Sequence, residues 1–176
     1  MLLAKKGKYE EAEPLCREVL EVRRETLGNR HPHTLIAMGT LAVELHSQGK
    51  YDEAEPLFRE VLEATRETLG NRHSDMLTSI SNLGGLLHAK GDLAAAEPLC
   101  REALEVQRET LGDRHPSTLG SINNLGLLLK DKDGLAAAEP LLREALEGMH
   151  ETLGSRHPTT LIVTNNLAQC AAEGQG

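Results

Sequence analysis

Histidines lie close together in the stretch TLGNRHPHTL, where His31 and His33 are two residues apart. Imidazole nitrogens are common zinc ligands and general bases, so this spacing could serve a metal site or an acid–base site. The stretch recurs at steps of 42 residues as TLGNRHSDML, TLGDRHPSTL and TLGSRHPTTL, beginning at Thr68, Thr110 and Thr152. A period of this length is typical of a helical repeat protein, and the histidines must be interpreted within that repeat.

The repeated histidines are His31, His73, His115 and His157, one in each unit. Packed helices lie ~8–10 Å apart, whereas zinc holds its imidazole nitrogens at ~2.0–2.1 Å and normally has four ligands. Equivalent loop positions therefore cannot share one ion. The sequence predicts no metal and no cofactor, and we expect each Arg-His-Pro loop to fix the start of the following helix by packing and hydrogen bonding.

Catalytic groups are scarce elsewhere in the chain. Ser79, Ser81, His88 and Cys100 are the groups that could be assembled into a nucleophilic site. No nucleophile-elbow, phosphate-loop or paired-carboxylate spacing surrounds them. The sequence therefore predicts a protein that is not an enzyme.

Two kinds of helix make up each 42-residue unit. The segment from Tyr51 to Gly70 has apolar residues at helical spacing on one face and Glu and Arg on the others. The segment from Pro32 to about Gln48 has a second such apolar face, and Gly49 follows it. Neither helix can bury its apolar face alone, so the units are expected to stack as an all-α solenoid of antiparallel helix pairs. Pro56 and its copies are expected in the first turn of the outer helices, where no backbone hydrogen bond is lost.

Composition narrows the class of protein further. The 176-residue chain is 39% apolar but only 2% aromatic, which suits closely packed helices better than sheets. Its net charge of −8 argues against nucleic-acid binding, and no apolar window is long enough for membrane insertion. Three cysteines without CxxC spacing indicate a reducing compartment, and we expect a cytoplasmic protein with Cys16 and Cys100 reduced and buried.

Two helical-repeat types fit this period, HEAT or armadillo units and a lengthened tetratricopeptide unit. Small residues at the positions of close helix approach, such as Gly84, Ala96 and Ala103, favour the second. With its recurring LG-x-RHP, NNL and AEPL-xx-EAL, the sequence resembles the tetratricopeptide repeats of kinesin light chains and their relatives over essentially the whole chain. The resemblance implies a right-handed superhelix. The expected organisation is one array, predicted to be a fragment of a longer one, with a partial unit 1–28, units 32–70, 74–112 and 116–154, and a terminal helix 158–176.

In such a superhelix the first helix of each unit lines the concave face, so the resemblance implies that a protein or peptide binds there. Aligned units place one basic and two polar rows on this face, and we predict that an extended peptide contacts Asn82, Asn123, Asn124, Asn165, Asn166, His46, His88 and Lys130. An asparagine amide both donates and accepts, so a row of amides can bind a peptide backbone without demanding a sequence. The alternative, which remains open, is that these amides tie neighbouring inner helices together.

Charge separates the two kinds of helix. The four outer helices contain eight basic and 21 acidic residues, which leaves a charge of +5 on the rest of the chain. The expected function is a non-enzymatic interaction scaffold of the kinesin-light-chain type. The alternative function is the sensor array of a larger signalling ATPase. The terminal helices carry apolar faces without polar caps, so end-to-end self-association is a further expectation.

Overall fold

The computed structural model describes residues 9–69, 74–132 and 134–174. These residues form eight α-helices and no strand, which confirms the predicted all-α fold. In chain order the helices are α1 (Tyr9–Leu27), α2 (Pro32–Ser47), α3 (Tyr51–Leu69), α4 (Ser74–Lys90), α5 (Leu93–Leu111), α6 (Pro116–Asp131), α7 (Leu135–Leu153) and α8 (Pro158–Glu173).

Glycines with positive φ explain why the outer helices end where they do. Gly28, Gly112 and Gly154 follow α1, α5 and α7 with φ of +85°, +85° and +86°, a conformation that side chains bearing a Cβ rarely adopt. The amide of Gly112 still donates to the carbonyl of Arg108, which closes the last turn. The observed first and last residues of the helices agree with the predicted ones to within two residues, because glycines such as these determine where a helix ends.

The expected position of the prolines was wrong. Ala54 donates to the carbonyl of Lys50, so α3 begins at Tyr51 and Pro56 is its sixth residue. Pro98 and Pro140 are also the sixth residues of α5 and α7. One backbone hydrogen bond is therefore lost inside each helix. All three prolines are exposed, so water can satisfy the carbonyl group that is left without a partner.

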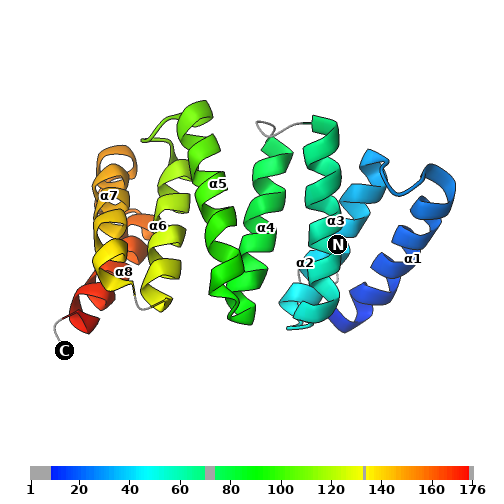
Figure 1. Ribbon diagram of the computed structural model, residues 1–176, viewed down its shortest axis with the longest axis horizontal. Helices are drawn as coiled ribbons and strands as arrows, with labels where there is room; N and C mark the ends of the chain where they lie inside the picture. The colour runs from blue at the N-terminus through cyan, green and yellow to red at the C-terminus, as the bar shows by residue number, and fades with distance from the viewer. Residues whose placement is uncertain (1–8, 70–73, 133, 175–176) are drawn as a thin grey trace. The chain divides into compact units, whose positions relative to one another are not determined.

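The helices group into two compact units, Met1–Lys90 and Gly91–Gly176. In the first unit α1 packs on α2, α2 on α3, and α3 on α4. In the second, α5 packs on α6, α6 on α7 and α7 on α8, with a smaller contact between α6 and α8. Figure 1 shows successive helices of each unit running in opposite directions. We call α1, α3, α5 and α7 the outer helices and α2, α4, α6 and α8 the inner helices.

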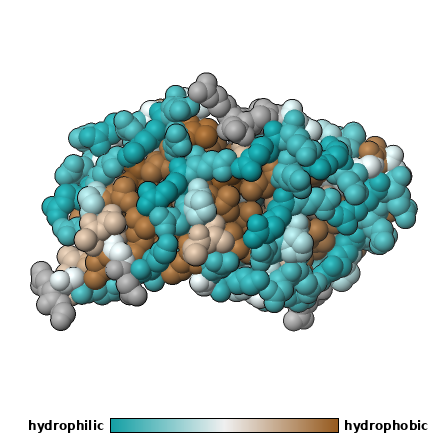
Figure 2. Space-filling model, viewed as in Figure 1, coloured by the Kyte–Doolittle hydropathy of each residue, from teal (hydrophilic) through white to brown (hydrophobic). Residues whose placement is uncertain are grey.

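Each unit has its own apolar core. In the first unit Met38 and Leu45 from α2 and Ile80 from α4 are at most 1% exposed, and Phe58 of α3 is buried with them. In the second unit the buried side chains include Leu119, Ile122 and Leu125 of α6 and Leu142 and Met149 of α7. Hydrophilic residues cover much of the face seen in Figure 2, with apolar residues visible between them. Aliphatic side chains therefore form the packing, as the composition indicated.

The cysteines depart from expectation in one respect. All three are free thiols, but Cys16 and Cys100 are half-buried, and only Cys170 is buried. Cys16 lines an open groove on α1, which is why the prediction of burial was wrong there. Burial still raises the pKa of the Cys100 thiol above its ordinary value. In the part of the chain that is described, no helix combines the length and apolar character needed to cross a membrane.

Candidate binding surface of the inner helices

The loop histidines cap the inner helices. The Nδ1 atoms of His31, His115 and His157 each accept a hydrogen bond of 3.2 Å from the backbone N–H two residues later. Each histidine has extended backbone angles, and proline follows it as the first helical residue. This bond satisfies one of the amides that a helix start leaves without an internal partner. The predicted role in fixing the helix start is confirmed for these three; His73 lies outside the described residues.

No metal-binding cluster forms around these caps. Across residues 9–69, 74–132 and 134–174, no group of three or more His, Cys, Asp or Glu side chains is placed to hold a metal ion. His33 stacks against His31 with ring centroids 5.3 Å apart, and the Nδ1 of His31 is occupied by its capping bond. The described surface therefore offers hydrogen bonds and charges instead of metal ligands.

In the second unit, three of the predicted asparagines form a connected network. The Nδ2 of Asn166 on α8 donates to the Oδ1 of Asn123 on α6 at 2.9 Å, and the Nδ2 of Asn123 lies 3.4 Å from the Oδ1 of Asn124. Asn123 is only 8% exposed, whereas Asn124 and Asn165 are exposed. The structure thus brings the two predicted rows together. The bond between the amides of Asn123 and Asn166 ties α6 to α8, and the side chains of Asn124 and Asn165 are exposed.

In the first unit, the predicted polar residues lie on α2 and α4. Asn82 is half-buried on α4 and His46 is half-buried on α2, where its ring centroid lies 5.5 Å from that of Tyr51. The Nε2 atom of His46 is buried and has no hydrogen-bond partner among the described residues. His88 of α4 is also half-buried.

Lys130 already has acidic partners. Its Nζ lies 3.2 Å from a carboxylate oxygen of Glu173 and 3.8 Å from one of Asp131, and its side chain is 14% exposed. An acidic ligand would therefore have to compete with Glu173 for this ammonium group. The sequence did not indicate this pairing, because the two residues lie 43 positions apart on α6 and α8.

Two glycines permit close helix packing, and they lie on α6 and α7. A Cβ on Gly148 would lie 2.3 Å from the Cδ2 of Leu119, and one on Gly126 would lie 2.9 Å from the side chain of Leu142. By contrast, nothing lies within 4 Å of a Cβ built on Gly39, Gly85 or Gly120. Those three inner-helix glycines face open space, so packing within the described chain gives no reason for them.

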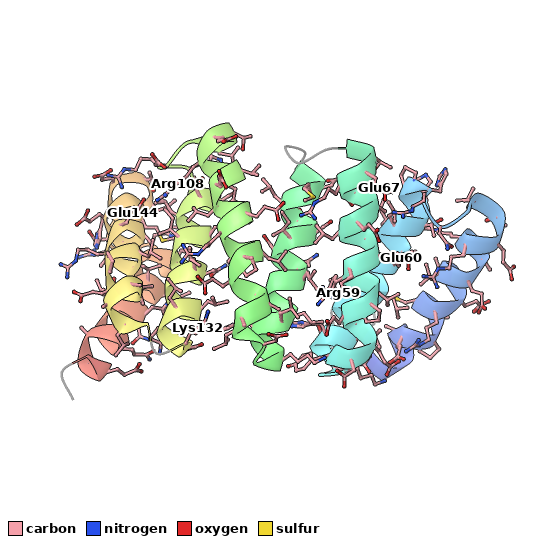
Figure 3. All side chains as sticks on the ribbon, in the orientation of Figure 1. Arg59, Glu60, Glu67, Arg108, Lys132 and Glu144 are labelled. Carbon is pink, nitrogen blue, oxygen red and sulfur yellow. The ribbon has the colours of Figure 1, made fainter. Side chains whose placement is uncertain are left out.

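Ion pairs tie consecutive outer helices at a fixed separation along the chain. Arg24 binds Glu60 at 3.0 Å and Arg108 binds Glu144 at 2.6 Å, each across 36 residues. Figure 3 labels Arg108 and Glu144 on α5 and α7. Two arginines of the Arg-His loops follow a similar rule: Arg30 pairs with Glu67 and Arg114 with Glu151, both at 3.1 Å. The sequence placed these charges on the outer helices but did not indicate which partners meet.

A second set of ion pairs joins the outer helices to the ends of the inner ones. The ammonium groups of Lys50, Lys90 and Lys132 bind Glu13, Glu55 and Glu97 at 2.7, 2.9 and 2.7 Å. Hydrogen bonding to these lysines is the main reason that the pKa values of the three carboxyl groups lie below their usual range. The carboxylates are therefore held ionised, as structural links.

An open apolar groove of about 360 Å³ lies between α1 and α2. Leu15, Val19 and Ile36 line it and are 54%, 45% and 60% exposed. Cys16 and Thr40 complete its wall. The apolar face of α1 was predicted from the sequence, but the groove was not, because its second wall belongs to α2.

The model of the tetratricopeptide repeat matches residues 1–67 and 75–149 of this sequence. The chain belongs to the tetratricopeptide repeat family. Repeat arrays of this family generally mediate protein interactions and are typically non-catalytic. No curated protein matches the sequence.

Solved structures with the same fold include kinesin-light-chain-like proteins. A protein of Podosopora anserina, described as a kinesin light chain with nearly identical TPR-like repeats, is 29% identical with a TM-score of 0.87, over 98% of this chain and 82% of that one. BtubC (BKLC) of P. vanneervenii is 24% identical with a TM-score of 0.80, over 99% of this chain and 70% of that one. The type III secretion translocator chaperone SycD of Yersinia enterocolitica is more distant, at 19% identity, a TM-score of 0.60, and coverage of 79% and 91%. The tetratricopeptide array is thus similar to those of kinesin-light-chain-like proteins.

Proposed function

We propose that the chain is a non-catalytic scaffold that binds an extended peptide or partner segment through its inner helices, as a kinesin-light-chain-like array. The observation that carries this proposal is the set of asparagine groups left available around the Asn123–Asn166 bond. That bond uses the Nδ2 of Asn166 and the Oδ1 of Asn123. Within the described residues, no hydrogen bond uses the Nδ2 group of exposed Asn124 or the side-chain amide of exposed Asn165.

These groups match the chemistry of a peptide backbone. An extended peptide offers an N–H donor and a C=O acceptor at each residue. The Nδ2 of Asn124 can donate to a peptide carbonyl, while the Oδ1 of Asn166 can accept from a peptide N–H. Because Asn123 and Asn166 hold each other in place, fewer rotamers are lost when the ligand binds, and this favours affinity.

Each unit has further predicted contacts of its own. These are Asn82, His46 and His88 in the first unit and Lys130 in the second. Lys130 is held by Glu173 at 3.2 Å, so an acidic peptide group would replace one carboxylate with another. This arrangement favours peptides with a few acidic residues over strongly acidic ones. A cytoplasmic location is part of the proposal, and the free thiols of Cys16, Cys100 and Cys170 support it.

Some of these asparagines are exposed and others are hydrogen-bonded to each other, so the proposal can be tested with matched variants. An array of immobilised peptides of mixed composition is probed with the wild-type chain, and affinities for the peptides that bind are then measured by calorimetry. Asn124→Ala with Asn165→Ala should weaken binding several-fold to a hundredfold, since each lost hydrogen bond contributes ~0.5–1.5 kcal/mol. The same double variant should lower the melting temperature less than Asn123→Ala does, because it removes only the long 3.4 Å bond to the Oδ1 of Asn124 and leaves the Asn123–Asn166 bond intact.

The control is Asn123→Ala, which breaks the tie between α6 and α8. It should lower the free energy of unfolding by ~0.5–1.5 kcal/mol, because it removes a part-buried hydrogen bond. If Asn124→Ala with Asn165→Ala binds every peptide as the wild type does, the inner helices are not the binding surface.

A further inference from the structure

Two exposed aliphatic side chains on the inner helices share their repeat positions with glycines of the neighbouring inner helix. Val43 of α2 is 46% exposed, and the equivalent residue of α4, 42 positions later, is Gly85. Ile162 of α8 is 59% exposed, and the equivalent residue of α6, 42 positions earlier, is Gly120. A Cβ built on either glycine would have no described atom within 4 Å. Each unit therefore combines an exposed aliphatic side chain with an open glycine at one repeat position of its two inner helices.

These two repeat positions are open in the interior of the array as well as near its ends. In the sequence α4 has one inner helix before it and two after it, and its residues at these positions, Thr78 and Gly85, are both exposed. Gly120 of α6 is followed by α8 within the same unit, and the place of its Cβ is still open. The exposure of Val43 and Ile162 therefore does not depend on where the chain begins or ends.

Both glycines lie one helical turn from an asparagine of the proposed peptide surface. Gly85 comes three residues after Asn82, and Gly120 comes four residues before Asn124. Residues three or four apart lie on the same face of a helix. One turn is ~5.4 Å long and an extended residue spans ~3.3 Å. A peptide whose backbone is bound by the asparagine would therefore place a side chain, one or two residues further on, over the glycine.

We propose that the peptide bound by the inner helices carries an aliphatic side chain that fills the space over Gly120 and packs against Ile162. A second such side chain packs over Gly85 against Val43. The inference rests on the proposed peptide binding and adds the kind of side chain that the peptide must present. Valine, leucine, isoleucine and methionine are the residues that fit this description.

Size and polarity both favour an aliphatic side chain. The equivalent residue of each glycine is valine or isoleucine, so the glycine leaves free about the volume of one aliphatic side chain. Contact with Ile162 or Val43 would remove apolar surface of both partners from water. Glycine also destabilises a helix interior relative to alanine, and packing among the described residues gives no reason for it at Gly85 and Gly120. A ligand side chain that uses the free space supplies that reason.

The first test is a substitution scan of peptides that the wild-type chain binds, with affinities measured by calorimetry. Each peptide position is replaced in turn by alanine, aspartate and leucine. At least one position should require an aliphatic residue, with alanine weakening the affinity by about tenfold and aspartate by more. Asparagine amides that bind only the peptide backbone would produce no such position, because every residue offers the same backbone groups.

The second test asks whether that peptide position meets the named residues. Ile162→Ser removes the apolar wall and Gly120→Leu fills the space, so each should weaken binding of the aliphatic peptide by about fivefold. Each should change the affinity of the alanine-substituted peptide by less than about twofold, because that peptide has already lost the contact. Val43→Ser and Gly85→Leu form the corresponding pair in the first unit. Leu111→Ser is the matched control, since it changes a leucine of α5 that is 43% exposed and should leave both affinities unchanged.

The outcomes separate this inference from the proposed function. Circular dichroism first establishes that each variant is folded. If Asn124→Ala with Asn165→Ala weakens binding but no peptide position requires an aliphatic residue, the aliphatic contact is wrong and the proposed function stands. The contact is also wrong if Ile162→Ser and Val43→Ser affect the aliphatic and the alanine-substituted peptide by the same factor. A chain that binds none of the peptides would overturn both.

Discussion

The guanidinium group of Arg108 lies 2.6 Å from the carboxylate of Glu144, which joins α5 to α7 across 36 residues of sequence. The two side chains are 39% and 36% exposed, so water screens the attraction between them. The pair nevertheless repeats the contact between Arg24 and Glu60 in the first unit. Its repetition indicates a role in setting the register of the outer helices more than a large contribution to stability.

A double-mutant cycle on this pair should give a small coupling energy. Arg108→Ala, Glu144→Ala and the double variant should yield ~0.2–1 kcal/mol in urea unfolding, as exposed ion pairs do. The coupling should decrease in ~1 M salt, where the screening length is ~3 Å. A coupling above ~2 kcal/mol that is insensitive to salt would show that the pair is effectively desolvated.

Gly148 and Gly120 should respond in opposite ways to the same substitution. Gly148→Ala places a methyl group 2.3 Å from Leu119, so we expect a loss of ~1–3 kcal/mol in the free energy of unfolding. Gly120→Ala meets nothing within 4 Å and removes a glycine from a helix, so it should stabilise the chain by ~0.4–1 kcal/mol. Equal effects at both positions in thermal unfolding would contradict the close approach of α6 and α7.

The capping role of His115 predicts which replacements it tolerates. His115→Ala removes the acceptor for the amide of Ser117 and should cost ~0.5–2 kcal/mol. His115→Asn keeps a side-chain acceptor at this position, and its stability in urea should lie within ~0.5 kcal/mol of the wild type. If His115→Asn loses as much as His115→Ala, the imidazole acts through packing and not through its hydrogen bond.

Acid should weaken the links between lysines and glutamates. The hydrogen bond from Lys132 is the main cause of the lowered pKa of Glu97 in the folded chain. A carboxyl group with a lower pKa when folded stabilises the fold above its unfolded pKa, ~4.3, and this contribution is lost as pH falls through the folded value. Urea unfolding at pH 6 and at pH 3 should therefore show a smaller pH dependence for Glu97→Gln than for the wild type.

Lys132→Met provides the matched control for that titration. It removes the donor and leaves the carboxyl group, so the pKa of Glu97 should return toward its ordinary value and the pH dependence should be reduced in the same direction. If Lys132→Met retains the full pH dependence of the wild type, a different partner lowers the pKa of Glu97.

Local features of the sequence were enough to predict the helices. The glycines after α1, α5 and α7 need positive φ, and the apolar positions recur with a helical period, so both bounds and faces could be inferred. The position of the prolines within the helices was predicted wrongly. Each is the sixth residue of its helix and therefore lies beyond the first turn. Their exposure, which makes that position tolerable, depends on the packed structure and could not be read from the sequence.

The candidate surface was predictable in outline only. The register placed Asn123 and Asn166 in adjacent rows, but whether their amides meet depends on how close α6 and α8 approach. Both helices pack on α7, and the close contact of α6 with α7 at Gly126 and Gly148 could not be read from the sequence. Likewise the half-exposure of Cys16 follows from the groove beside it. Whether the predicted asparagines, histidines and lysine bind a peptide stays a prediction.

Packing in the second unit links each helix to the next, with smaller contacts across one intervening helix, between α6 and α8 and between Arg108 of α5 and Glu144 of α7. No two segments that are distant in sequence must find each other before the unit can fold, so little chain entropy is lost in closing loops. Folding of such a unit can begin at any helix pair and spread to its neighbours. Its rate should therefore be governed by the stability of one helix pair and depend little on how many repeats the chain contains.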